Sequence, residues 1–282
     1  MAIKIITDST CDIPFERQQE LGIEIVPLSV RFGSEEYIDG VTLTKQEFYK
    51  KLTECSDLPT TAQVNPDQFA TVFQKHLDAG DEVVGIFISG KLSGTFQSAD
   101  IAKNMLGSDK IHVIDSLNVT FGLALLVYEA VKMRDNGLSA QEICDGIYGL
   151  IKKLKFYIIL DTLKYLKMGG RLSSSAAFMG TMLHIKPIIS LVDGAVAVVE
   201  KKKGQKAAVE WLMQKVDRQQ PNPDCEVVFG GSAAPEFVAL VQSELRARVP
   251  EEKEKTVEMG AVVGTHAGPG SAGLAYIAKT DE

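Results

Sequence analysis

The sequence predicts an α/β protein of two domains, an N-terminal domain with a parallel sheet and a C-terminal domain with a mixed sheet. Three observations predict this class. The chain has 282 residues, about twice the length of an average domain. Its first half alternates short β-branched runs with capped helical segments, as βαβ units do. Its second half contains Asp193-Gly194, a two-residue signal for an antiparallel hairpin. We place the boundary near residue 155, giving domains 1–155 and 156–282.

The composition indicates a globular protein and argues against several classes of partner and location. Hydrophobic residues make up 45% of the chain and charged residues 24%, as in ordinary globular proteins. The net charge of -7 argues against nucleic acid as the principal partner. The four cysteines show no Cys-x-x-Cys spacing and the start of the chain is unlike a signal peptide, so we expect a reduced, cytoplasmic protein. No apolar run approaches the roughly 20 residues that span a bilayer, so any membrane contact is expected to be peripheral and transient.

The first elements follow from local signals. Residues 3–7 form a β-branched run that predicts a strand, and Pro14 fits the first turn of a helix that ends near residue 21. Residues 23–32 and 36–38 are predicted to be extended. Thr44-Lys45-Gln46-Glu47 is a capping box that opens a helix to about residue 53.

The next segments repeat the alternation of strand and helix. Residues 55–64 are predicted to be a loop, and Asn65-Pro66 starts a helix. Residues 83–88 are continuously apolar, as in a strand buried on both faces, and a polar Gly-rich loop at 89–95 leads into another helix. Such loops are where α/β proteins place binding sites. Residues 111–114 predict a further strand.

Two long helices complete the first half, and the pattern then changes. The first ends near Asn136-Gly137, and the second opens at the capping box Ser139-Ala140-Gln141-Glu142. After a strand at 156–160 and a short helix at 162–167, the hairpin Asp193-Gly194 joins two strands. The remaining predicted elements are helices at 207–219 and 235–248 and strands at 187–192, 195–201, 226–229 and 256–259.

Ser93 is the first candidate for a functional residue. It lies in Gly90-Lys91-Leu92-Ser93-Gly94, between a buried strand and a helix start. Its hydroxyl and the following free amides can face an anion, and the same position also suits a helix N-cap serine. The spacing is Gly-x-x-Ser-Gly, which matches the Gly-x-Ser-x-Gly nucleophile elbow only loosely.

Two further segments concentrate polar groups. Thr60 and Thr61 are adjacent hydroxyls just before a helix start, a pattern that a ligand site or plain turn chemistry explains equally well. His266 stands in Gly264-Thr265-His266-Ala267-Gly268-Pro269-Gly270, where glycines predict a loop built around it. A structural histidine remains the alternative.

Sequence motifs for metal or nucleotide binding are missing. There is no His-x-x-x-His, and neither cysteines nor histidines cluster at ligand spacing, so we expect no metal site. The chain also has no Walker loop and no Gly-x-Gly-x-x-Gly after a strand. We therefore expect no cofactor.

Five segments together resemble the DegV family of bacterial fatty-acid-binding proteins, over nearly the whole chain. Each is modest alone, but their order and spacing are specific. The segments are Ile6-Thr7-Asp8-Ser9-Thr10-Cys11-Asp12, Thr60-Thr61-Ala62-Gln63 with Pro66, Ile88-Ser89-Gly90-Lys91-Leu92-Ser93-Gly94-Thr95-Phe96-Gln97-Ser98-Ala99, Gly169-Gly170-Arg171-Leu172-Ser173, and Gly264-Thr265-His266-Ala267-Gly268-Pro269-Gly270.

The resemblance implies a fold, a ligand and a partner. Members of the family have two α/β domains and hold one long-chain fatty acid in a tunnel between them. They are the lipid-binding subunit of the fatty acid kinase system, in which a separate kinase subunit phosphorylates the bound carboxylate to an acyl-phosphate for phospholipid synthesis. The protein itself is then not an enzyme. The implied carboxylate-binding residues are Thr61, Ser93, Gly94, Thr95 and His266, with Thr60, Ala62 and Gly268 in support.

The resemblance also implies contacts with the kinase or the membrane, at Arg171, Phe178 and Lys203. Lys203 stands where the family commonly has an arginine, which keeps the charge but loses the planar guanidinium. A solvated basic rim is the alternative interpretation. The apolar segment 173–184 is either a core helix or a lid that opens at a membrane surface.

Two other functions remain open on the sequence. One is a hydrolase that acts on a lipid-like ester through Ser93 and His266, for which Asp8 or Asp115 would be the acid. The other is a kinase in its own right, which the missing phosphate loop disfavours.

Overall fold

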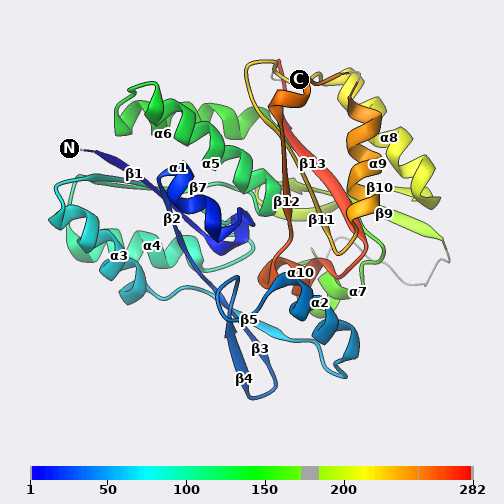
Figure 1. The fold of residues 1–282 in the computed structure, drawn as a ribbon, viewed down its shortest axis with the longest axis horizontal. Helices are drawn as coiled ribbons and strands as arrows, with labels where there is room; N and C mark the ends of the chain where they lie inside the picture. Colours follow the sequence, from blue (N-terminus) through cyan, green and yellow to red (C-terminus); the bar gives the residue numbers. More distant parts are fainter. Residues whose placement is uncertain (1, 173–183, 247, 281–282) are drawn as a thin grey trace.

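A computed structural model describes residues 2–172, 184–246 and 248–280 of the chain. Within these residues two main sheets lie side by side (Figure 1). The first has four parallel strands in the order β2-β1-β6-β7. The second has six strands in the order β10-β9-β8-β13-β11-β12 and is mixed, because only β11 and β12 are parallel. The predicted fold class is confirmed.

The first part of the chain builds the parallel sheet. Its strands are β1 (Ile3–Asp8), β2 (Ile23–Val26), β6 (Glu82–Phe87) and β7 (Ile111–Asp115). Its helices are η1 (Ser9–Cys11), η2 (Phe15–Arg17), α1 (Gln18–Leu21), α2 (Lys45–Glu54), α3 (Pro66–Asp78), α4 (Thr95–Leu106), α5 (Thr120–Asp135) and α6 (Ala140–Lys153). Helices α3 and α4 contact one side of the sheet, and α5 and α6 contact the other (Figure 1).

The second part builds the mixed sheet. Its strands are β8 (Leu154–Ile159), β9 (Ile185–Val192), β10 (Ala195–Lys203), β11 (Val227–Ser232), β12 (Glu254–Glu258) and β13 (Ser271–Ile277). Its helices are α7 (Lys164–Met168), α8 (Gly204–Arg218), α9 (Pro235–Leu245), η3 (Glu251–Lys253) and α10 (Ala261–Ala267). Helices α8 and α9 cover its outer face (Figure 1). Strand β8 begins beside the boundary placed at residue 155, and the domain division itself stays a prediction.

Three helix starts have the reciprocal hydrogen bonds of a capping box. Thr44 caps α2, Asn65 caps α3 and Ser139 caps α6, and in each the side chain at the third helical position bonds back to the cap. Such a cap contributes about 1 kcal/mol because it satisfies amides that the helix leaves free. The starts predicted at these positions are confirmed.

Helix α5 lies between the two sheets and is buried on every side along Thr120–Val131. A helix that is apolar all round belongs in a core, which explains the dense apolar run of the sequence. The helix contacts β1 and β6 of the parallel sheet and β11 and β13 of the mixed sheet. Phe121 stacks on Phe156 with ring centroids 4.6 Å apart. One hydrophobic core therefore joins both sheets.

The predicted hairpin is confirmed, with its turn at Asp193 and Gly194. These residues have φ of 48° and 80°, as a type I′ turn requires. The turn reaches the loop after β6, where the hydroxyl of Ser89 donates to the carbonyl of Gly194 at 2.8 Å.

Three short elements differ from the sequence predictions. The loop predicted at 55–64 contains β5 (Thr60–Ala62), which pairs with β3 (Ser29–Phe32); β3 also pairs with β4 (Glu35–Ile38) to complete a small sheet. The loop predicted around His266 is wrong, since that residue lies in α10. Strand β13 was missed entirely, although it lies inside the mixed sheet.

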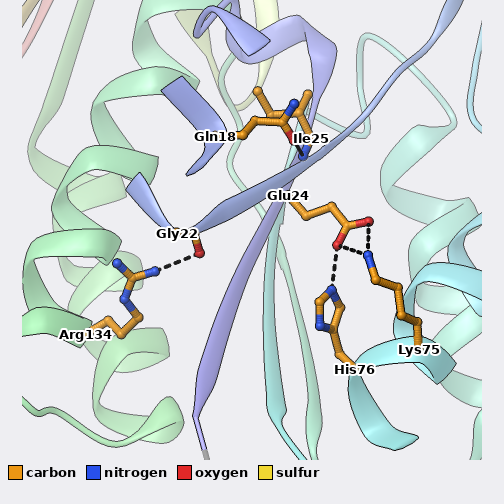
Figure 2. A network of polar contacts seen from close by, with 7 residues as sticks. All are labelled: Gln18, Gly22, Glu24, Ile25, Lys75, His76 and Arg134. Carbon is orange, nitrogen blue, oxygen red and sulfur yellow. Dashed lines mark hydrogen bonds and ion pairs between the residues drawn. The ribbon is translucent and has the colours of Figure 1, made fainter. Parts of the chain in front are cut away.

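A polar network holds the edge strand β2 in place (Figure 2). The side chain of Gln18 accepts from the amide of Ile25 at 2.9 Å, which satisfies a donor at this edge of the sheet. Glu24 lies 2.9 Å from Lys75 Nζ and 2.6 Å from His76 Nε2. Arg134 donates to the carbonyl of Gly22 at 3.0 Å.

No helix in the described part of the chain is long and apolar enough to cross a membrane. The apolar segment 173–184 was predicted to be a core helix or a lid, and residues 173–183 of it lie outside the described residues.

Candidate functional site

A cavity with about 850 Å³ of empty space, part of it continuous with solvent, lies where the two sheets meet. Ile88 and Val119, which follow strands β6 and β7, line one part of it. Ligands of open α/β sheets bind outside the carboxyl ends of parallel strands, which is where these residues stand.

The far wall of the cavity is apolar and comes from the mixed sheet. Phe156 and Ile158 of β8, Ile189 and Leu191 of β9, and Val196 of β10 line it. Residues two apart on a strand point to the same face, so β8 and β9 each present a pair of apolar side chains to the cavity. Such a wall suits a hydrocarbon chain.

The other end of the cavity is polar and is assembled from segments far apart in sequence. Thr61 of β5, Ser93 and Gly94 before α4, Arg171 after α7, and His266 of α10 all line it. Four of these were predicted to bind a carboxylate. Arg171 was predicted to contact a kinase or a membrane, and the structure places it in the cavity wall.

His266 lies against Thr61, with 3.1 Å between Nε2 and the threonine hydroxyl. Its Nδ1 is buried and has no hydrogen-bond partner among the described residues. Burial, and to a lesser degree the charge of Arg171, lower its pKa from 6.5 to about 4. The imidazole is therefore neutral at pH 7, so it orients the threonine hydroxyl without adding a charge.

Ser93 lies one residue before Gly94, the N-cap of α4, so the interpretation of Ser93 as a helix N-cap serine is wrong. Its hydroxyl is 2.9 Å from the hydroxyl of Thr95 and accepts from the Thr95 amide at 3.3 Å. Its own amide donates to the carbonyl of Ser89 at 3.1 Å. Ser93 thus lies just before the helix start and lines the cavity, and the positive end of the helix dipole favours an anion there. Thr95 is fully buried behind it.

Arg171 is fixed by two backbone carbonyls. Nε donates to Leu92 at 3.3 Å and Nη1 donates to Gly169 at 2.7 Å. No aspartate or glutamate of the described ranges forms an ion pair with this guanidinium. The Arg171 guanidinium therefore gives the cavity wall a positive charge, and no carboxylate of the described residues neutralises it.

Of the predicted supporting and contact residues, some line the cavity and others do not. Ala62 lines the cavity, whereas Thr60 is exposed on β5. Gly268 has a φ of 70°, and a Cβ there would lie 2.1 Å from the Tyr165 ring, so glycine shapes the end of α10. Lys203 is exposed at the end of β10. Phe178 lies outside the described residues.

Gln63 and Gly169, which the sequence did not indicate as site residues, also shape the polar end of the cavity. A Cβ on Gly94 would lie 2.0 Å from Oε1 of Gln63, which lines the cavity and donates to Ser98 at 3.0 Å. A Cβ on Gly169 would lie 2.2 Å from Nδ1 of His266. The Gly169-Gly170 pair was a visible signal, but only the fold shows what it contacts.

The hydrolase hypothesis requires Ser93, His266 and an acid in a relay, and the described residues do not assemble one. The ring of His266 bonds to Thr61, and the hydroxyl of Ser93 bonds to Thr95. Asp8 accepts from Thr10 and from the amide of Ile88, while Asp115 accepts from backbone amides at 90 and 117. Nor do the described ranges contain a group of three potential metal ligands.

A pocket with a cation, two hydroxyls and a neutral histidine at one end and an apolar wall at the other matches an amphiphile with an anionic head. The chain matches the family model described as "Uncharacterised protein, DegV family" over residues 2–279. A DegV domain-containing protein of Caldanaerobacter subterraneus is 37% identical over 278 residues, which cover 98% of this chain and 99% of that protein.

Solved structures agree with the sequence match. A DegV family protein from Thermus thermophilus, described by its fatty acid binding, has a TM-score of 0.90 at 32% identity and covers 98% of this chain and 100% of its own. A stearic acid-binding protein from Eubacterium ventriosum has a TM-score of 0.87 at 31% identity and covers 99% of each chain. The chain belongs to the DegV family.

Proposed function

We propose that this protein binds one long-chain fatty acid in the cavity. Thr61, Ser93 and His266 surround the carboxylate together with the amides at Gly94 and Thr95, and Arg171 balances its charge. The acyl chain lies along the apolar wall formed by β8, β9 and β10. The fatty acids bound by relatives from Thermus thermophilus and Eubacterium ventriosum support this choice of ligand.

The observation that favours this function most is a cation, Arg171, that forms no ion pair with a carboxylate of the described residues and lies beside a neutral histidine in the cavity wall. A buried carboxylate loses several kcal/mol of hydration unless it finds donors and an opposite charge. The hydroxyls and the helix start supply the hydrogen-bond donors, and Arg171 supplies the opposite charge. The apolar wall offsets the remaining cost, because each buried methylene contributes about 0.8 kcal/mol.

We extend the proposal to presentation of the carboxylate to a separate kinase subunit, as the resemblance implies. The kinase brings the ATP and forms an acyl-phosphate, so this chain supplies binding and orientation rather than catalysis. Lys203, exposed on β10, and Phe178 are the proposed contacts with the kinase or a membrane surface. The proposal places the protein in the cytoplasm, in transient contact with the membrane.

Mass spectrometry of the purified protein tests the ligand. We expect the native mass to exceed the chain mass by one fatty acid and to return to the chain mass after organic extraction. The delipidated protein should take up one equivalent of added fatty acid. A protein that is empty as purified and takes up none would contradict the proposal.

A pair of serine variants separates binding from hydrolysis. Ser93→Ala should weaken fatty acid binding roughly tenfold, since it removes a hydrogen bond to a charged group. The matched control Ser243→Ala removes an exposed hydroxyl that bonds only to the carbonyl of Leu240 and should change nothing. Turnover of a p-nitrophenyl ester that depends on Ser93 would support the hydrolase instead.

Reconstitution with a bacterial fatty acid kinase subunit and ATP tests presentation. We expect acyl-phosphate only when both proteins are present, and Lys203→Met should reduce its rate without changing fatty acid affinity. Lys152→Met, on α6, is the matched control. Equal rates for the two variants would remove Lys203 from the kinase contact.

A further inference from the structure

Four consecutive residues that lead into α10 are each bound by a side chain from the first part of the sequence. Lys45 donates to the carbonyl of Glu258, and Tyr49 donates to that of Met259 at 3.0 Å. The next two backbone groups are amides: Gly260 donates to Asp12 Oδ1 at 2.7 Å and Ala261 donates to Asp39 Oδ1 at 2.9 Å. The pairs lie more than 200 positions apart in sequence, so these bonds join the two halves of the chain.

The two carboxylates take the place of an N-cap. Residue 260, the cap position of α10, is a glycine and has no side chain that could bond to the first turn. A Cβ at Gly260 would lie 2.9 Å from Asp39 Oδ1 and 3.1 Å from Asp12 Oδ1, so glycine lets both carboxylates approach. Free amides at a helix start need such acceptors.

Both carboxylates are buried, at 3% exposure each. Burial raises the pKa of Asp12 to about 7, and Lys45 opposes this rise. Burial also raises the pKa of Asp39. Fold stability alone does not favour such groups in a core, because desolvation costs several kcal/mol for each ion.

Helix α10 connects this contact to the polar end of the cavity. Ala261 also accepts from the hydroxyl of Thr265 at 2.8 Å, and the next residue is His266. Val262 and Val263 line the cavity, so the helix forms part of its wall. Because the helix is only seven residues long, a shift at its start moves His266 relative to Thr61.

We propose that Asp12 and Asp39, with Lys45 and Tyr49, are positioning residues that set His266 against Thr61 and thereby make the cavity prefer a carboxylate. They do not touch the ligand. This inference rests on the proposed fatty acid binding and adds to it the residues that determine head-group selectivity.

The test compares a long-chain fatty acid with the primary alcohol of the same chain length. Asp39→Ala should raise the dissociation constant of the acid roughly tenfold, as expected for one misplaced hydrogen bond to a charged group, and that of the alcohol less than about threefold. Asp39→Asn keeps an oxygen acceptor and should restore most of the preference. The ring ¹⁵N resonances of His266 should shift in Asp39→Ala and return in Asp39→Asn.

Glu129 provides the matched control. It is a buried carboxylate that accepts from the amide of Glu226 at 2.8 Å and so joins α5 to the segment before β11. Glu129→Ala should lower stability but leave the preference for acid over alcohol unchanged. If Asp39→Ala does not fold, Tyr49→Phe removes the hydroxyl that bonds to Met259 and should reduce the same preference.

Two results would overturn the inference. One is an equal loss of acid and alcohol binding, which indicates a merely structural role. The other is unchanged His266 resonances in Asp39→Ala. If the wild-type protein binds neither ligand, the proposed function fails, and the His266 resonances still decide whether Asp39 positions the ring.

Discussion

Two histidines of this protein, the buried His76 and the partly buried His266, have opposite surroundings. His76 lies 2.6 Å from the carboxylate of Glu24, which Lys75 also contacts, at the edge of the parallel sheet (Figure 2). His266 lies against the hydroxyl of Thr61, with Arg171 lowering its pKa. The site around His76 contains its own anion, the carboxylate of Glu24. At the second, the described residues supply donors and a positive charge but no paired carboxylate, which is what a site for an anionic ligand requires.

The same contrast holds for two arginines. Arg134 donates to the carbonyls of Leu21 and Gly22, and also pairs with Asp135. Arg171 likewise donates to two carbonyls, yet it lines the cavity. Similar hydrogen bonds thus serve the fold in one region and the site in the other, and substitutions can separate the two roles.

The largest expected effect is that of Arg171→Met. Removing the cation beside a buried carboxylate should raise the fatty acid dissociation constant about 100-fold, or about 3 kcal/mol. Competition with a fluorescent fatty acid measures it. Arg134→Met is the control and should lower the free energy of unfolding without changing affinity. Unchanged affinity in Arg171→Met would remove this residue from the head-group site.

His76→Ala should show the reverse pattern. It removes a buried ring and one partner of Glu24, so the free energy of unfolding should fall by about 2 kcal/mol, with fatty acid affinity unchanged. Urea denaturation measures it. Lys75→Ala removes the exposed partner of the same carboxylate and should cost less than about 1 kcal/mol. Equal losses from the two variants would mean that burial of the ring does not matter.

Gly169→Ala should reproduce a defect of His266 without touching that residue. The added methyl would lie 2.2 Å from Nδ1, and so the ring must move. Fatty acid affinity should fall roughly tenfold, or about 1.4 kcal/mol. Gly149→Ala, with nothing within 4 Å of the new methyl, is the control and should be neutral or slightly stabilising. Full affinity in Gly169→Ala would show that the ring position is not critical.

The comparison also predicts a difference in the pH dependence of stability. The His266 pKa falls from 6.5 in the unfolded chain to about 4 in the fold, so only the unfolded chain gains this proton as the pH drops through that window. The stability difference between wild type and His266→Gln should therefore fall between pH 6.5 and pH 4, by at most about 3 kcal/mol. Asp8 and Asp12, whose pKa values burial raises to about 6 and 7, have the opposite effect and cancel in this difference.

Glu24 should lose its contribution in a more acidic window than His266. Burial raises its pKa, but hydrogen bonds from Lys75 and His76 outweigh burial, so the net pKa lies below the ordinary 4.5. Its contribution is present above pH 4.5 and is lost as the pH falls through the lowered value. Chemical denaturation of Glu24→Gln and His266→Gln over pH 3–8 distinguishes the windows, and a common window would contradict the contrast between the two sites.

The sequence predicted the elements whose signals are local. Capping boxes at Thr44, Asn65 and Ser139 open helices as expected, and Asp193-Gly194 forms its turn, because these bonds join residues within a few positions. The long helix before Asn136-Gly137 was also predicted, whereas its burial between the two sheets was not.

Elements that depend on distant partners were missed. Strand β5 has three residues and exists because β3 pairs with it, and α10 has seven residues whose first amides are bound by Asp12 and Asp39. An isolated helix of that length is not stable in water, so the local sequence does not predict it.

By itself, the sequence determined the fold class, the capped helices and, through its resemblance to the DegV family, the residues Thr61, Ser93 and His266 as site candidates. Only the tertiary structure decided that Arg171 lines the same cavity, that Gly169 packs on His266, and that β8 to β10 supply the apolar wall. The physical reason is the sequence separation of the interacting residues, because caps and turns form between near neighbours in the chain. A cavity instead forms from segments that meet only after the two sheets have packed on α5.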